Sequence, residues 1–94
     1  MSQSASPYPI SQMINRVMED HGYSTVEFVQ SLGHRNIERG LRRLEAWLDR
    51  GEGYERILKQ IAAAFPNQAE ELKKAVTATK AVKAAGFEAS WIRA

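Results

Sequence analysis

Five arginines occupy one short stretch of this sequence, between residues 35 and 50. The planar guanidinium of arginine can contact two phosphate oxygens, or the O6 and N7 atoms of guanine, at the same time. At about 100° per residue in a helix, these side chains gather opposite an apolar stripe. The arginines are Arg35, Arg39, Arg42, Arg43 and Arg50, and the stripe is Ile37, Leu41, Leu44 and Leu48. The pattern predicts a helix that docks by one face and presents cations by the other.

The acidic residues of the same stretch share one flank of the predicted helix. They are Glu38, Glu45 and Asp49. Glu38 can pair with Arg42 at i+4 or with Arg35 at i−3, and such pairs are typical of a solvated surface. The arginines without such an acidic neighbour are Arg39, Arg43 and Arg50. We therefore expect the basic side to bind an anionic partner. The alternative is that the basic face only aids solubility.

No residue pattern indicates catalysis or metal binding. The chain has no cysteine, and its two histidines, His21 and His34, lack a third ligand at a metal-binding spacing. The segment Gly51-Glu52-Gly53 is too short to cradle a phosphate and lies between helices rather than after a strand. No nucleophile elbow is present. We expect no enzymatic activity, no metal and no cofactor.

Composition is consistent with one soluble domain. The chain has 94 residues and a formal net charge of +2, distributed as −2 over 1–32, +2 over 33–65 and +2 over 66–94. No apolar run approaches the roughly 20 residues that span a bilayer, and the polar N-terminus does not resemble a signal peptide. We expect a cytoplasmic protein with no membrane association.

Apolar side chains recur at helical spacing along most of the chain, and no segment alternates with the period of a strand. The expected fold is therefore all-α, a compact bundle of about five helices with a helix-turn-helix-like element. Residues 1–9 are predicted to form a flexible arm, and residues 10–94 a single helical domain. The predicted helices span residues 10–21, 25–32, 36–50, 54–65 and 68–85, followed by a short apolar tail at 87–92.

Local signals mark the predicted second helix. Ser24 and Glu27 have the spacing of a capping box, and Tyr23 and Phe28 have the spacing of a hydrophobic staple. Gly33 follows the helix and can adopt the left-handed conformation that ends it. The second helix is therefore short and begins at a well-defined residue.

The other helix boundaries depend on single residues. Asn36 can cap the third helix. Asn67, with Glu70 three residues later, is predicted to cap the fifth helix, which should end near Gly86. Gly40 lies inside the third helix on the same flank as Trp47, so it either allows close helix approach beside a buried indole or acts as a hinge.

A short helix, a glycine turn and an arginine-bearing helix are the parts of a helix-turn-helix. The segment Phe28-Val29-Gln30-Ser31-Leu32-Gly33-His34 resembles the second helix and turn of the phage-repressor and Cro (XRE-type) family. The segments Trp47–Gly51 and Ile57–Ala62 resemble the end of its recognition helix and the helix that follows. The resemblance covers about residues 12–65 and implies a fold that places the third helix against duplex DNA. The interval from Gly33 to Gly51 is longer than in that family, so the third helix is either longer or interrupted near Gly40.

These observations predict a small DNA-binding regulator that uses the basic face of its third helix. The alternative is a protein-binding adaptor or inhibitor, phage- or host-encoded, whose charged helix contacts an acidic protein surface. The DNA-binding hypothesis requires that no other helix covers the basic face of the third helix. The expected nucleic-acid contacts are Arg35, Asn36, Arg39, Arg42, Arg43 and Arg50.

The C-terminal tail suggests a second surface. Phe87, Trp91 and Ile92 would form one apolar patch if residues 87–92 are helical. This patch either folds back onto the core or contacts a second copy of the chain. A homodimer is the functional possibility, because symmetric operators are bound by symmetric dimers.

Overall fold

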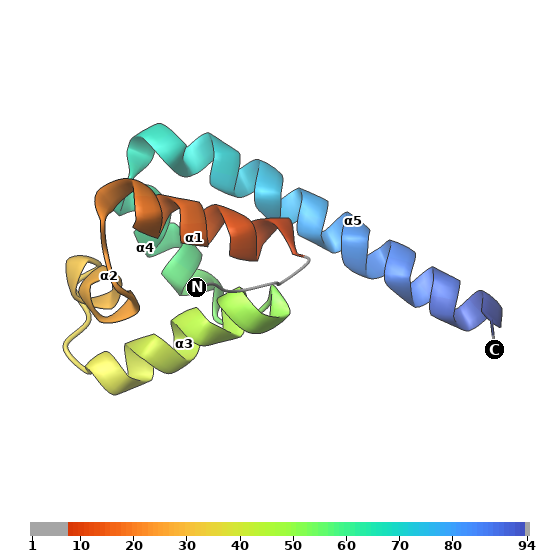
Figure 1. The fold of residues 1–94 in the computed structure, drawn as a ribbon, viewed down its shortest axis with the longest axis horizontal. Coiled ribbons are helices and arrows are strands. Elements are labelled where there is room, and N and C mark those ends of the chain that lie inside the picture. The colour runs from red at the N-terminus through yellow and green to blue at the C-terminus, as the bar shows by residue number, and fades with distance from the viewer. Residues whose placement is uncertain (1–7, 94) are drawn as a thin grey trace.

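Five α-helices and one short 3-10 turn make up almost all of residues 8–93, the part of the chain that this computed structural model describes; side chains are described for residues 8–85 (Figure 1). No strand occurs in that part, so the predicted all-α class and the number of helices are confirmed. The elements are α1 (Pro9–His21), α2 (Thr25–Ser31), α3 (Ile37–Arg50), α4 (Glu55–Ala64), η1 (Pro66–Gln68) and α5 (Ala69–Arg93).

The helix-start signals before α2 and α3 act as predicted. The Ser24 hydroxyl accepts a bond from the Glu27 backbone N–H, and the Glu27 carboxylate accepts one from the Ser24 N–H, which completes the capping box. The staple also forms, because the Tyr23 and Phe28 rings lie 6.4 Å apart. The Asn36 side-chain oxygen accepts from the Arg39 backbone N–H at 3.0 Å and caps α3.

The core forms where α1 lies between α5 on one side and α2 and α3 on the other. Helix α1 contributes more buried apolar residues than any other helix because its apolar side chains repeat at i, i+3, i+4 and i+7. Helix α3 contributes Leu44 and Trp47, and α4 contributes Ile57 and Ile61. The buried apolar residues are Ile10, Met13, Ile14, Val17, Met18, Phe28, Val29, Leu44, Trp47, Ile57, Ile61 and Leu72.

The predicted start of the fifth helix at residue 68 lies within one residue of the observed start, but its predicted cap and its predicted end were wrong. Asn67 makes no capping bond and lies inside the 3-10 turn η1, because Pro66 starts that turn and α5 begins only at Ala69. At the other end α5 continues through Gly86 to Arg93, so residues 87–92 are part of this helix and not a separate tail. A single glycine costs about 1 kcal/mol in a helix, and no proline follows to end this one.

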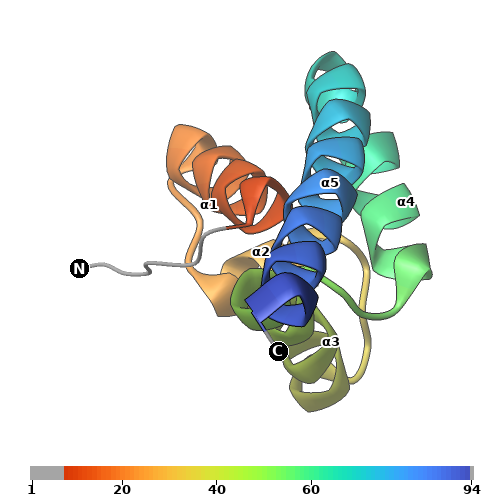
Figure 2. The ribbon, with the colours of Figure 1, turned by 90° about the vertical axis from the view of Figure 1, so that its right-hand side faces the viewer.

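The C-terminal part of α5 projects beyond the other helices (Figure 1) and points toward the viewer in Figure 2. The predicted dimer contacts Phe87, Trp91 and Ile92 lie on this part, where side chains are outside the described residues. No helix in the described range is both long and apolar enough to cross a bilayer.

Buried polar bonds join the start of α1 to α5 and to the end of α3. The Thr79 hydroxyl accepts a bond from the Ile10 N–H at 2.9 Å and donates to the Ala75 carbonyl at 2.7 Å. The Ser11 hydroxyl donates to the Trp47 carbonyl. Because the first N–H groups of a helix have no partner within it, Thr79 satisfies one of the free donors of α1.

We predict that Thr79→Val lowers the free energy of unfolding by about 1–3 kcal/mol, because it keeps the side-chain shape and leaves the buried Ile10 N–H without an acceptor. Urea unfolding measures this change. Thr77→Val is the matched control, since Thr77 is exposed and its hydroxyl bonds only to the Lys73 carbonyl of its own helix. Equal losses in the two variants would contradict the role given to Thr79.

Candidate nucleic-acid interface

Helices α2 and α3 are joined by a tight turn at residues 32–36. Figure 1 shows α2 nearly end-on while α3 runs across the page, so the two helices cross steeply. Gly33 has φ +87°, a left-handed conformation that glycine adopts without strain. The local sequence thus produces the helix-turn-helix-like arrangement that it predicts.

At Gly40, α3 packs closely against α2 and the turn that follows it. A Cβ atom at this position would lie 2.5 Å from Cγ1 of Val29 and 3.0 Å from Nδ1 of His34. Helix α3 is continuous from Ile37 to Arg50, so Gly40 is not a break. Of the two sequence interpretations, close approach is correct, although the neighbour is α2 and its turn rather than the indole of Trp47.

His34 fixes the turn to the rest of the fold. Its Nε2 lies 2.7 Å from Oε1 of Gln60 on α4, and because an amide oxygen only accepts, the imidazole donates. His34 therefore has a structural contact on the inner side of the turn, close to Gly40. The turn thus packs against α3 at Gly40 and bonds to Gln60 on α4. These two contacts fix the position of the first turns of α3.

The predicted contact residues of the third helix lie on its solvent side. Arg35, Arg39, Arg42 and Arg50 are exposed. Asn36 is also exposed, but its side-chain oxygen is occupied by the cap, so only its amide nitrogen is available to a ligand. Arg43 differs because its guanidinium lies 4.1 Å from the centre of the Tyr54 ring and is partly buried.

Most of these arginines have no acidic partner among the described residues. Arg42 contacts Glu38 at 3.9 Å, and both side chains are largely exposed, at 77% and 82%. Such a pair contributes little, on the order of 0.5 kcal/mol. The other pair considered from sequence, Arg35 with Glu38, is not formed within the described residues. Four of the five arginines therefore form no direct ion pair within the described residues.

Charge is divided between the two edges of α3. Arg39, Arg43 and Arg50 recur at spacings of four and seven residues and form one edge, which we call the arginine edge. It lies on the side of Tyr54, as the contact of Arg43 with that ring shows. The acidic residues Glu38, Glu45 and Asp49 lie on the other edge. An anion is therefore attracted to one side of α3 and repelled from the other.

Sequence reasoning missed Arg56 on α4. Arg56 precedes Gln60 by one helical turn, so the two share a face, and Gln60 reaches His34 in the α2–α3 turn. Arg56 is exposed and lies on the flank of α4 that is directed toward this turn. The spacing of Arg56 within α4 does not predict its position relative to α3, because that position depends on how α4 packs against the other helices.

Within the described part of the chain, no group of three histidine, aspartate or glutamate side chains could hold a metal ion. The side chains of this candidate interface are arginines, one tyrosine ring and amide groups, which can bind an anion. Comparisons with protein-family models, curated proteins and solved structures find no match to this chain.

Proposed function

We propose that this chain is a small cytoplasmic regulator of helix-turn-helix type, which binds duplex DNA through the arginine edge of α3. The observation that carries the proposal is an exposed, largely unpaired set of arginines on a helix whose apolar side packs against the core, with Leu44 buried and Ile37, Leu41 and Leu48 half-buried. In Figure 1, α3 forms the lower border of the molecule and no other helix lies beyond it. Such a surface is accessible to a large anion.

The charge division of α3 suggests how the duplex lies. Phosphates would be repelled by Glu38, Glu45 and Asp49, so the duplex is placed on the opposite edge, toward Tyr54 and Arg56. Arg35, Arg39 and Arg43, around the start and first half of α3, are suited to groove and phosphate contacts, while Arg42 and Arg50 contact phosphates at the periphery. The 14 residues of α3 span about 21 Å.

The length of α3 also affects the docking geometry. A major groove about 12 Å wide cannot accommodate the whole helix lengthwise across it. The first two turns, held by the Gly40 contact and the His34 bond, are the part best fixed for insertion. Arg50, at the far end, is left to reach a neighbouring phosphate.

Fluorescence anisotropy with a labelled mixed-sequence duplex tests the proposal. If about four phosphates are contacted, raising the salt concentration from about 50 to about 200 mM should weaken binding on the order of 100-fold. A steep loss of this kind supports a nucleic-acid partner. Absence of binding at the lower salt concentration contradicts the proposal and favours an acidic protein surface as the partner of the same helix.

The proposal includes a homodimer on symmetric DNA sites. The projecting part of α5 is the segment available for it, because no other helix covers that part in Figure 1. Sedimentation of the protein with a palindromic duplex measures the number of chains bound. One chain per duplex at saturation would remove the dimer from the proposal without affecting the α3 contacts.

A further inference from the structure

A trough runs between α4 and α5, on the flank of α4 that faces away from Arg56. Its main hollow has a volume of about 410 Å³, and its floor is apolar, with Leu58, Leu72 and Val76 as the largest side chains. A second hollow of about 240 Å³ continues it toward the α3–α4 loop and shares Leu58 and Val76 with the first. The two hollows together extend along α5 from Ala69 to Lys83, about 20 Å of helix.

The floor of the trough is incompletely covered by the chain itself. Leu58, Ala62 and Val76 are only partly buried, although Leu72 beneath them is 3% exposed. Apolar side chains at helical spacing on both walls leave a lengthwise strip that another helix can complete. The size and direction of the strip fit a helix of about 14 residues lying along α5.

The rim of the trough is basic. Lys59 and Lys73 line the first hollow and Lys80 lines the second, and none of the three has an acidic partner within the described residues. Lys83 at the far end already donates to Glu52 at 2.7 Å, and this bond lowers the pKa of the Glu52 carboxyl. Glu55 is the one acidic side chain of the trough left without a partner among the described residues.

The charge of the rim determines which occupant fits. A second copy placed face to face on this trough would bring its own lysines against Lys59, Lys73 and Lys80, and like charges oppose that arrangement. An apolar helix flanked by glutamate or aspartate would instead gain attraction at the rim and cover the floor. A partner helix that carries acidic side chains is therefore the complementary occupant of the trough.

We propose that the α4–α5 trough is a docking site for an acidic amphipathic helix of a partner protein. The site is separate from the arginine edge of α3, because α4 presents one flank to α5 and the other to the α2–α3 turn. It does not depend on the function proposed for α3, and both surfaces can be occupied in one molecule.

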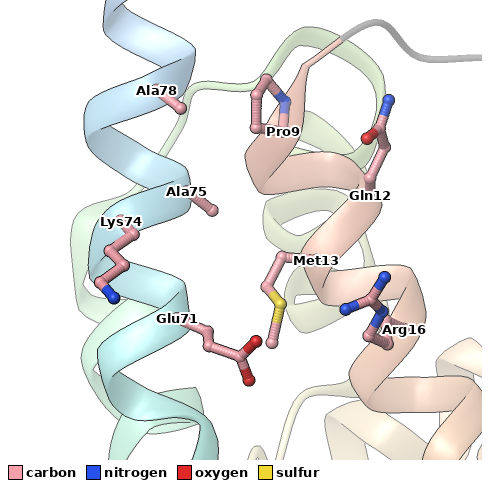
Figure 3. Close-up of a pocket in the computed structure, with 8 residues that line it drawn as sticks. All are labelled: Pro9, Gln12, Met13, Arg16, Glu71, Lys74, Ala75 and Ala78. Atoms are coloured by element: carbon pink, nitrogen blue, oxygen red, sulfur yellow. The ribbon is translucent and has the colours of Figure 1, made fainter.

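The hollow on the other side of α5 gives a contrast. Figure 2 shows α1 and α4 on opposite sides of α5, and Figure 3 shows the α1–α5 hollow with Met13 and Glu71 directed into it. Its charged lining residues are Arg16, Glu71 and Lys74, which have both signs and select no particular charge. Lys74 lies on α5, as Lys73 does, but it lines this hollow and not the trough. It is therefore a suitable control position.

The test uses a fluorescent synthetic helix of about 14 residues, with leucine at i, i+3, i+4 and i+7 and glutamate elsewhere, added to the full chain. We expect a dissociation constant below about 100 µM, and binding at least about tenfold weaker for a matched peptide with lysine in place of glutamate. Lys59→Glu with Lys73→Glu should weaken binding of the acidic peptide by about tenfold.

Lys74→Glu is the control and should leave the affinity of the acidic peptide within about twofold of that of the unmodified chain. Circular dichroism confirms that each variant is folded. The proposal is overturned if the acidic peptide does not bind, if the basic peptide binds equally well, or if Lys74→Glu weakens binding as much as the trough variants do.

Discussion

Replacing Arg39 and Arg43 together by alanine is expected to weaken duplex binding by about 100-fold at low salt, and to reduce its salt dependence. Each arginine supplies a charge-assisted contact to a phosphate or a base edge, and losing one such contact costs about tenfold in affinity. The loss should be similar for different duplex sequences if the contacts are mainly to phosphates. Fluorescence anisotropy at two salt concentrations measures both effects.

A control variant and the expected stability of the double variant separate this effect from a general loss of charge or of folding. Arg16→Ala removes an exposed arginine from α1, away from α3, and should leave duplex affinity nearly unchanged. Arg43→Ala also removes the contact of this partly buried side chain with the Tyr54 ring, which contributes on the order of 1 kcal/mol, so the variant should remain folded. Equal losses in Arg16→Ala and in the double variant would contradict a specific role for the arginine edge.

Gly40→Ala is expected to lower the free energy of unfolding by about 1–2 kcal/mol, although alanine is the better helix former. The new methyl group would overlap Cγ1 of the buried Val29 and press on His34, so α2 and α3 must separate or their side chains must leave their preferred rotamers. Duplex affinity should also fall, because the same contact fixes the start of α3. Chemical denaturation and anisotropy measure the two effects.

A double-mutant cycle with Val29→Ala tests this explanation. Val29→Ala alone leaves a cavity and should cost about 2 kcal/mol, but it also removes the atom that the new methyl group would overlap. The two substitutions together should therefore cost less than the sum of their separate effects, by about 1 kcal/mol. Strict additivity of the two free-energy changes would contradict this explanation. A Gly40→Ala variant as stable as the original chain would also contradict it, because it would show that α2 and α3 leave room for a methyl group at residue 40.

Local signals made much of the fold predictable from sequence. Three of these signals each depend on a few consecutive residues, so a sequence pattern is enough to predict them. They are the capping box at Ser24 and Glu27, the Asn36 cap and the left-handed conformation of Gly33. Helix ends without a strong signal were less predictable. At Gly86 the flanking helix formers outweigh the glycine, and at Asn67 the preceding proline sets the local geometry.

The candidate site was predictable only where it lies on one helix. The division of α3 into a basic and an acidic edge follows from helical periodicity, and the exposed arginines are where that periodicity places them. The contact of Arg43 with Tyr54, the position of Arg56 and the α4–α5 trough depend on how α4 packs against its neighbours. No spacing within a single helix contains that information.

The most direct test of the central proposal is amide mapping by NMR, in which a ¹⁵N-labelled sample of the full chain is titrated with duplex DNA. The account predicts that the shifted amides cluster at Arg35, Arg39 and Arg43, with smaller changes at Arg56, while α1 around Arg16 stays unaffected. A different cluster, centred on the lysines of α5, or uniform small shifts over the whole surface, would contradict binding through the arginine edge of α3.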